Sequence, residues 1–453
     1  MKYLSTRGQS EPTDFAGAFA AGLAPDGGLY LPVDLPDIRD RLADWEDLSY
    51  PDLAFEFLRL FDTTHSPADL KALVDKSYST FDHEDCAALR PLRPNLQVLE
   101  LFHGPTLAFK DFGLQLLGNL FEDQITRTGE PINVLGATSG DTGAAAIHGL
   151  AGKDGVRVFI LYPEGRISEL QERQMTCTGA ENIFPIPIKG SFDDAQRIVK
   201  SLFGDLELKK QLRLSAINSI NLARILAQSV YYFHASRLLP AAQRDQVQFI
   251  VPTGNFGNVF AGWLAARMGM PAGSFQIATN QNDILHRLFT TGIYEPGRVD
   301  PSLAPSMDIQ VASNFERFLY FSSDGDTDRV RESMAELQEK GRLEIPDLDR
   351  ERFLSTRSDD RDIARLIAEI HAKDGYLVDP HTACAFRDVD PDRPSVILAT
   401  AHPAKFPETI EEIGIETTHP RLEALRPLEQ VRYSVEATDE VVAAFLRENG
   451  LVD

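Results

Sequence analysis

Short apolar runs alternate with amphipathic helical patterns through most of the chain. Runs rich in β-branched and aromatic residues predict strands, whereas apolar residues at three- and four-residue spacing predict helices. The predicted strands are residues 132–135, 156–161, 248–251 and 395–400. The predicted helices include residues 112–121, 144–151, 222–238 and 259–268. Because strand-then-helix alternation favours parallel pairing with both faces of the sheet covered, we predict an α/β fold built of parallel layers.

The first 92 residues have a different pattern. A turn at residues 25–28 (Pro-Asp-Gly-Gly) accompanies helical patterns at residues 53–61 and 68–78, which predicts a small helical layer. Residues 90–94 read Arg-Pro-Leu-Arg-Pro, and proline disfavours helix at its own position and at the one before it. We therefore expect a domain boundary there.

A charge-dense segment, residues 322–374, is predicted to be helical. Its Asp324, Asp326 and Asp328 have the spacing of the first ligands in a calcium-binding loop. The glycine that such a loop requires is replaced by Arg329, and its twelfth position is Ala335 instead of glutamate. We interpret the aspartates as a solvated helix start.

Composition limits the classes of function. A chain of 453 residues exceeds one ordinary core, so two or three domains are expected. The 45 basic and 68 acidic side chains give a net charge of −23, which disfavours nucleic-acid and membrane partners. The three cysteines form no CxxC pair, so neither a disulfide framework nor a zinc site is indicated. With no apolar run of membrane-spanning length and no secretory signal, a cytoplasmic location is expected.

Two glycine-rich turns each follow a predicted strand and precede a predicted helix. Residues 136–143 read GATSGDTG, and residues 253–258 read TGNFGN. Glycines let the backbone turn sharply, and free N–H groups at a helix start attract an anion. Neither turn matches the nucleoside-triphosphate loop or the GxGxxG dinucleotide pattern. Each is either a simple connection or an anion site, and two such turns point to two anions, a cofactor phosphate and a substrate carboxylate.

Lys110 lies in the segment GPTLAFKDFG, where Leu107, Phe109 and Phe112 surround it. An isolated lysine is normally a solvated surface charge. An apolar pocket would instead disfavour the ammonium and leave a nucleophilic amine that can bond to an aldehyde.

Polar residues also mark two other places. Thr400 ends the predicted strand 395–400, where open α/β sheets bind ligands, although it could equally be only the last strand residue. Asn221, Arg224 and Gln228 share one face of the helix predicted from residue 222, and that face is either wet or lines a site. His402 has no second histidine at ligand spacing, so it is no metal candidate. Capping accounts for Asn218 and Ser219.

As an ordered set, the motifs resemble those of the threonine synthase family, in its longer form, among the fold type II pyridoxal-phosphate enzymes. They run through most of the chain as MKYLSTRG, LAPDGGLYLP, HGPTLAFKDFG, LGATSGDTGAAA, QERQM, NSINLARILAQ, PTGNFGNVFAG and ATAHPAKF. The resemblance implies a tryptophan synthase β-like fold with two parallel-sheet α/β domains and an N-terminal, mostly helical layer. The expected division is an N-terminal domain of residues 1–93, a large cofactor-binding domain of residues 94–128 and 225–453, and a small domain of residues 129–224 that carries the substrate loop.

The resemblance also implies roles for individual residues. Lys110 would bond covalently to pyridoxal 5′-phosphate and act as the catalytic residue, and Thr400 would hydrogen-bond to the pyridine nitrogen. The cofactor phosphate would lie on Gly254, Asn255, Phe256, Gly257 and Asn258. The substrate carboxylate and the cofactor ring would face Ser139, Gly140, Asp141, Thr142 and Gly143. Asp141 replaces the asparagine of many fold type II relatives, and a carboxylate there must be either protonated or paired with a donor.

Members of this family convert O-phospho-L-homoserine and water into L-threonine and phosphate, which makes them carbon–oxygen lyases acting on phosphates. Lys110 would remove the Cα proton, and the neutral hydroxyl of Thr400 would favour elimination and replacement over transamination. Arg224 and Lys405 are the candidates for binding the substrate phosphate, and Lys189 is a weaker one. Closure between the two α/β domains would exclude water from the site.

Other activities fit the same fold. A phospho-lyase would release 2-oxobutyrate, and a serine/threonine dehydratase would leave the N-terminal block unexplained. A non-catalytic interaction module is disfavoured because Lys110 and both glycine-rich turns are present. We expect a small-molecule substrate as the partner, and a monomer or small homo-oligomer.

Overall fold

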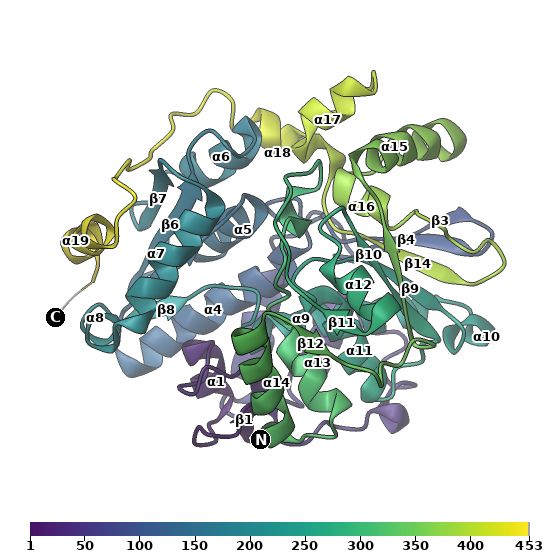
Figure 1. Cartoon of the computed structure of the whole chain (residues 1–453), viewed down its shortest axis with the longest axis horizontal. Helices are drawn as coiled ribbons and strands as arrows, with labels where there is room; N and C mark the ends of the chain where they lie inside the picture. Colours follow the sequence, from purple (N-terminus) through teal and green to yellow (C-terminus); the bar gives the residue numbers. More distant parts are fainter. Residues whose placement is uncertain (452–453) are drawn as a thin grey trace.

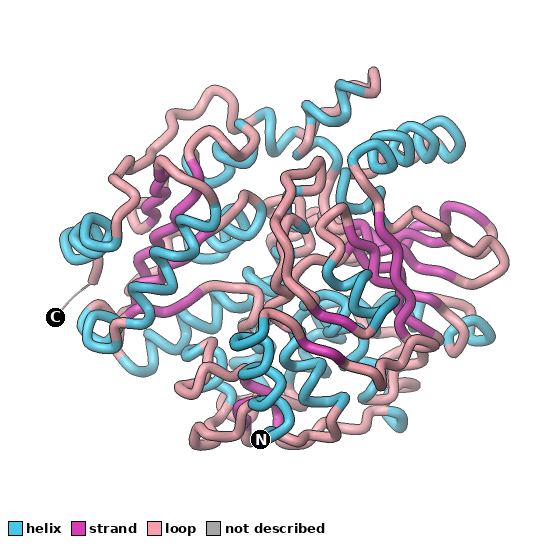
Figure 2. Tube along the Cα trace, viewed as in Figure 1, coloured by secondary structure: helices cyan, strands magenta, loops and turns pink. Residues whose placement is uncertain are grey.

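The computed structural model describes residues 1–451 and contains two main sheets, which appear as two separate groups of strands in Figure 2. The larger sheet has the strand order β13-β10-β9-β14-β4-β3, and the smaller one has the order β7-β6-β5-β8. Neighbouring strands in both sheets are parallel except β3 and β4, which are antiparallel. The predicted α/β fold of parallel layers is confirmed.

The predicted strands all occur, and each ends within two residues of its expected limits. The strands of the larger sheet are β3 (Ala88–Arg93), β4 (Leu96–Glu100), β9 (Gln248–Pro252), β10 (Ser274–Thr279), β13 (Phe353–Arg357) and β14 (Ser395–Ala399). Those of the smaller sheet are β5 (Ile132–Ala137), β6 (Val156–Pro163), β7 (Ile183–Ile188) and β8 (Leu214–Ala216). Two further antiparallel pairs join β1 (Tyr3–Ser5) to β2 (Tyr30–Pro32) and β11 (Ile293–Tyr294) to β12 (Leu343–Glu344).

Helices connect and cover the strands, and the helix predicted at residues 222–238 matches α9 at both ends. The first group is α1 (Phe15–Ala21), α2 (Tyr50–Leu58), α3 (Pro67–Tyr78), α4 (Lys110–Thr128), α5 (Asp141–Leu150), α6 (Glu169–Thr176), α7 (Phe192–Gly204), α8 (Leu206–Gln211), α9 (Leu222–Leu238), α10 (Ala241–Arg244) and α11 (Gly257–Arg267). The second group is α12 (Ile284–Thr291), α13 (Phe315–Ser322), α14 (Thr327–Lys340), α15 (Asp360–Asp374), α16 (Pro380–Cys384), α17 (Pro407–Glu412), α18 (Pro420–Glu423) and α19 (Asp439–Asn449). The 3₁₀ turns are η1 (Arg39–Arg41), η2 (Pro305–Met307) and η3 (Pro403–Lys405).

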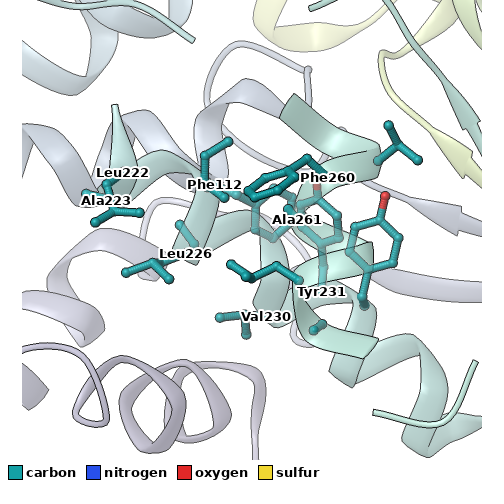
Figure 3. Close-up of a cluster of buried hydrophobic side chains, with 14 of the residues drawn as sticks. Phe112, Leu222, Ala223, Leu226, Val230, Tyr231, Phe260 and Ala261 are labelled. Carbon is teal, nitrogen blue, oxygen red and sulfur yellow. The ribbon is translucent and has the colours of Figure 1, made fainter. Parts of the chain in front are cut away.

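The central helices α4, α9 and α11 pack through buried apolar side chains. Figure 3 shows Phe112 of α4 close to Tyr231 of α9 and Phe260 of α11. Helix α9 is buried along almost its whole length, because side chains that face every direction meet other elements. In Figure 1 the smaller sheet lies to the left of these helices and the larger sheet to the right. Since Lys110 is the first residue of α4, the helix places it between the two sheets.

The expectation of a purely helical segment at residues 322–374 is wrong in its middle part. Helices α14 and α15 are present, but β12 and β13 lie between them. In β13 Phe353 is buried whereas Leu354 is exposed, as in an edge strand with one face toward solvent. The alternation of buried and exposed positions spans only a few residues, and the many charged residues around it conceal the strand in the sequence. Asp326 accepts a hydrogen bond from the N–H of Arg329 and caps α14, which confirms the predicted helix start.

Packing of the chain departs from the expected domain limits at two places. Strand β3 lies before the boundary at residue 93 yet pairs with β4, where proline is tolerated because β3 is an edge strand. At the other end, the N–H of Tyr433 bonds to the carbonyl of Pro185, and α19 buries its apolar face against the smaller sheet. Figure 1 shows α19 beside α7, far from β14. We therefore propose that residues 431–451 belong with the small domain and not with the expected large domain of residues 94–128 and 225–453.

No helix within residues 1–451 combines the length and the apolar character that crossing a bilayer requires.

Candidate active site

Lys110 is buried between the sheets, with 8% of the residue exposed. Its Nζ donates to Ser306 Oγ at 3.2 Å and lies 3.7 Å from Asp141 Oδ2. Burial is the main cause that lowers the pKa of Lys110 to about 8; Asp141 opposes the change, and the charges of Arg224 and Lys405 add to it. About a tenth of this amine is therefore uncharged at pH 7, far more than of a lysine with the ordinary pKa, and the uncharged form is what a nucleophile or a base requires.

Asp141 is held as a buried carboxylate at the start of α5. Lys405 is fully buried and lies 3.1 Å from Asp141 Oδ1, which also accepts from Gln171 Nε2 at 3.1 Å. Burial alone would raise the pKa of Asp141, but positive charges around it, Lys405 foremost, hold that pKa well below its usual range. Of the two states left open by the sequence, the paired carboxylate is the one found.

Lys405, the predicted ligand of the substrate phosphate, is surrounded by oxygen atoms of the protein itself. Besides Asp141, its ammonium donates to the Thr106 carbonyl at 2.5 Å and to Gln174 Oε1 at 2.9 Å. An ammonium has three hydrogens, and these three contacts use all of them. Lys405 therefore balances the charge of Asp141, and its ammonium already faces three acceptors of the protein.

A second polar chain reaches the site from α16. The Ser306 N–H donates to His381 Nε2 at 3.1 Å, and His381 Nδ1 lies 2.7 Å from Asp379 Oδ2. Because Nε2 accepts, these contacts assign the imidazole proton to Nδ1, from which it bonds to Asp379. The Thr382 hydroxyl also bonds to Asp379 and accepts from the N–H of Thr400 at 3.1 Å. One buried carboxylate thus fixes both the Ser306 turn and the end of β14.

The Thr400 position lies beside the Lys110 loop. Strand β14 ends one residue earlier, at Ala399, and the Thr400 carbonyl accepts from the N–H of Phe109 at 2.9 Å. Thr400 is 6% exposed, and its hydroxyl makes no hydrogen bond to any residue of the described chain. The hydroxyl is therefore available to a ligand placed next to Lys110.

The turn at residues 254–258, which we call the phosphate turn, presents five backbone N–H groups with no protein partner in residues 1–451. It opens α11, and Phe256 adopts a φ of +62° there. An added Cβ at Gly254 would lie 3.2 Å from both Met307 Cα and the Ser306 carbonyl oxygen. Because Ser306 also contacts Lys110, the phosphate turn lies next to the buried amine.

Side chains of the phosphate turn are tied to the protein. Asn255 Oδ1 accepts from Ser313 Oγ at 3.1 Å. Asn258 Oδ1 accepts from the hydroxyls of Tyr231 at 2.6 Å and Tyr232 at 2.9 Å, whereas the Asn258 Nδ2 is buried and has no partner in residues 1–451. A buried amide N–H is costly unless something accepts its hydrogen bond, so Asn258 adds a donor to the turn.

The turn at residues 139–143, which we call the substrate turn, has the same character. Thr138 Oγ1 accepts from the N–H groups of Gly140 at 3.0 Å and Gly143 at 2.8 Å and so shapes it. The N–H groups of Ser139, Asp141 and Thr142 have no protein partner in the described residues. They lie at the positive end of α5, where a carboxylate is favoured.

The polar face of α9 is buried and does not face solvent. Arg224 is 2% exposed, and its Nε and Nη1 have no partner among the described residues. Gly113, one turn after Lys110, allows α4 to approach Arg224 so closely that an added Cβ would lie 3.0 Å from the Arg224 Cα. Gln228 Oε1, an acceptor, is also buried without a partner among the described residues. Arg224 lies close enough for its charge to lower the pKa of Lys110, and its unpaired buried N–H groups call for an anion.

Two smaller expectations differ from the structure. The cap of α9 is Asn221, whose side chain accepts from the N–H of Ala223, so capping does not explain Asn218 and Ser219. Ser219 Oγ instead lies 2.9 Å from Ser313 Oγ, beside the phosphate turn. Lys189, the weaker phosphate candidate, follows β7 and is exposed.

Three family models match successive parts of the chain. Residues 2–78 match "Threonine synthase N terminus", residues 93–393 match "Pyridoxal-phosphate dependent enzyme", and residues 380–446 match "Threonine synthase, C-terminal". Among curated relatives, the threonine synthase of Pseudomonas aeruginosa is 47% identical over 426 residues, which cover 92% of this chain and 91% of the relative. The threonine synthase of Schizosaccharomyces pombe is 43% identical over 455 residues, which cover 90% of this chain and 88% of the relative. This chain belongs to the threonine synthase family.

Solved structures agree with this assignment. The pyridoxal-phosphate-bound threonine synthase of Brucella melitensis superimposes with a TM-score of 0.95 at 42% identity, covering 99% of each chain. Yeast threonine synthase gives a TM-score of 0.91 at 39% identity, covering 99% of this chain and 98% of the other. The predicted family, its fold type II architecture, its lyase activity and its dependence on pyridoxal phosphate are confirmed.

The residues of this site fit pyridoxal phosphate. Lys110 supplies a buried amine with a lowered pKa, the phosphate turn supplies unpaired N–H groups, and Thr400 supplies a hydroxyl without a protein partner. A side chain at Gly254 would press on the backbone of η2, so the glycine keeps the turn open. A phosphate, an aldehyde and a ring nitrogen thus each find a complementary group.

Proposed function

We propose that the chain converts O-phospho-L-homoserine and water into L-threonine and phosphate, using pyridoxal phosphate held by Lys110, Thr400 and the phosphate turn. The observation that carries the proposal is the arrangement around the Lys110 amine, which has an anion site for a cofactor, a second for a carboxylate, and an unpaired buried arginine. Three separate anions match a cofactor phosphate, an amino-acid carboxylate and a substrate phosphate. An amino acid without a phosphate would leave Arg224 unpaired.

Pyridoxal phosphate, when bound, supplies an aldehyde for the amine of Lys110 and a ring that stabilises negative charge at the substrate Cα. Residues of the chain take up and release the protons. Lys110 has a pKa lowered to about 8, so its free amine can take a proton from Cα at neutral pH. Thr400 offers a neutral hydroxyl and not a carboxylate, so it would not hold the pyridine nitrogen of the bound cofactor protonated, and the ring would then withdraw electrons less strongly.

Substrate orientation rests on two groups of donors. The free N–H groups of the substrate turn would hold the α-carboxylate, and Arg224 would hold the phosphate that leaves from Cγ. Asp141 does not repel these anions strongly, because Lys405 balances its charge. Water then adds at Cβ, and the buried setting limits water to that step.

The net charge of −23 supports a protein without nucleic-acid or membrane partners, and the composition supports a cytoplasmic enzyme that works as a monomer or small homo-oligomer.

Product analysis tests the proposed reaction. Purified protein loaded with pyridoxal phosphate should release phosphate from O-phospho-L-homoserine and form threonine in equal amount. A phospho-lyase would give phosphate and 2-oxobutyrate, and a dehydratase would deaminate serine or threonine without any phosphorylated substrate. A keto acid as the main product would refute the proposal.

Replacing Arg224 with Leu should lower kcat/KM for O-phospho-L-homoserine about 100- to 1,000-fold, because two charge-assisted hydrogen bonds to phosphate are lost. The loss should lie mostly in KM, and the absorbance of bound cofactor should stay as in the parent. Arg329→Leu, on the exposed side of α14, is the control and should leave the kinetics unchanged. Unaltered kinetics of Arg224→Leu would exclude Arg224 as the phosphate ligand.

A further inference from the structure

Ser306 is the one hydroxyl group found between the Lys110 amine and the Asp141 carboxylate in the described part of the chain. Its Oγ accepts from Lys110 Nζ at 3.2 Å and donates to Asp141 Oδ2 at 3.1 Å. Asp141 begins α5, which follows β5 of the smaller sheet, whereas Lys110 begins α4, which follows β4 of the larger sheet. Ser306, in η2, therefore links the Lys110 amine to the carboxylate on the side of the smaller sheet.

The direction of the Ser306 hydroxyl follows from the charge of its neighbours. Asp141 is ionised because Lys405 balances it, so its oxygens only accept hydrogen bonds. Ser306 must then give its single hydrogen to Asp141 and turn its lone pairs to Lys110. In this arrangement one N–H of the Lys110 amine points at Ser306. This bond also fixes where the other N–H bonds and, in the uncharged amine, the lone pair point.

Ser306 also holds the ion pair between Asp141 and Lys110 at a long distance. The carboxylate lies 3.1 Å from the ammonium of Lys405 but 3.7 Å from that of Lys110, and its Oδ2 is already bonded to the hydroxyl. Without that hydroxyl, Oδ2 would lose its donor and could form a shorter, direct ion pair with protonated Lys110. A direct ion pair stabilises the charged form of a lysine.

The position of Ser306 is itself fixed from two sides. Its N–H donates to His381, whose ring is held by Asp379, and its carbonyl oxygen lies against Gly254 of the phosphate turn. His381 is 3% exposed and Asp379 is fully buried. Two polar side chains buried this deeply cost free energy unless their hydrogen bonds are satisfied. One of these bonds comes from the Ser306 N–H, so the pair also holds the turn at Ser306 in place.

We propose that Ser306 is a further catalytic residue, which directs the Lys110 amine and keeps Asp141 from approaching that amine closely, and that His381 and Asp379 are positioning residues that act through Ser306. The proposal rests on the proposed role of Lys110 as the reacting amine. Charged or titratable groups face Lys110 from four elements around it: Asp141 of α5, Arg224 of α9, Lys405 of η3 and, through Ser306, His381 of α16.

The test measures the reactivity of Lys110 in cofactor-free, full-length protein, by trace acetylation with acetic anhydride across pH and quantification of the Lys110 peptide. The parent should react with a midpoint near pH 8. In Ser306→Ala the midpoint should rise by about one pH unit, so that Lys110 reacts about tenfold more slowly below pH 8. Ser306→Thr, which keeps the hydroxyl, should restore the midpoint, and His381→Phe should shift it in the same direction as Ser306→Ala.

Ser302→Ala is the matched control, because Ser302 stabilises the same loop through Asp308 without touching Lys110. It should leave the midpoint unchanged. In the loaded enzyme, Ser306→Ala should lower kcat about 10- to 100-fold with little change in KM, while circular dichroism matches the parent. An unchanged or lowered midpoint in Ser306→Ala, or an equal shift in Ser302→Ala, would overturn the role of Ser306. Should Lys110 of the parent titrate like an exposed lysine, the role of Lys110, and this proposal with it, would be rejected.

Discussion

Lys110→Ala should reduce threonine formation by at least about a thousandfold, since the variant loses both the amine that bonds to the cofactor and the base for the Cα proton. Lys110→Arg should be similarly inactive, because a guanidinium stays protonated and cannot take up a proton. Phosphate release and threonine content, measured at saturating substrate, give the size of the loss. Borohydride reduction of the loaded parent should mark the peptide that contains Lys110, and the variants should show no such mark.

Lys200→Ala is the control for this experiment, as Lys200 is an exposed lysine of α7. It should retain full activity and leave the reduced Lys110 peptide unchanged. If Lys110→Ala kept more than a tenth of the parent rate, another group would have to be the base. A reduced peptide that maps elsewhere in the chain would lead to the same conclusion.

Much of the fold could be predicted because its signals are local. A buried parallel strand such as β9 is a short apolar run, and α9 has apolar residues on nearly every face, so both stand out in the sequence. Both glycine-rich turns were predicted at strand-to-helix junctions, and they occur there as the starts of α5 and α11. The edge strand β13 was missed, since half of its side chains face solvent in a segment dominated by charge.

The partners of Lys110 could not be predicted in the same way. Ser306 is 196 residues away in sequence and lies in an irregular segment with no periodic pattern. His381 and Asp379 resemble an ordinary helix cap, and only the folded chain shows that they hold Ser306. For Lys405 the sequence predicts a phosphate ligand, and sequence spacing does not reveal that Asp141 and Gln174 surround it.

The pairing of Lys405 with Asp141 leads to the second large effect, which is on stability. Lys405→Met should lower the free energy of unfolding by about 3–5 kcal/mol, because it leaves a buried carboxylate without its counter-charge. Denaturant titration would measure the loss. Activity should fall as well, since Asp141 would then favour the protonated form of Lys110.

The double variant Lys405→Met/Asp141→Asn separates the ion pair from a role in phosphate binding. Removing both charges should recover much of the lost stability, because the double variant no longer buries a carboxylate that has lost the ammonium of Lys405. Recovery should be incomplete, as the Thr106 carbonyl and Gln174 Oε1 also lose a donor. A phosphate ligand would behave differently, since Lys405→Met alone would raise KM at unchanged stability and Asp141→Asn would not compensate. Additive losses in the double variant would show that Lys405 and Asp141 do not act as a pair.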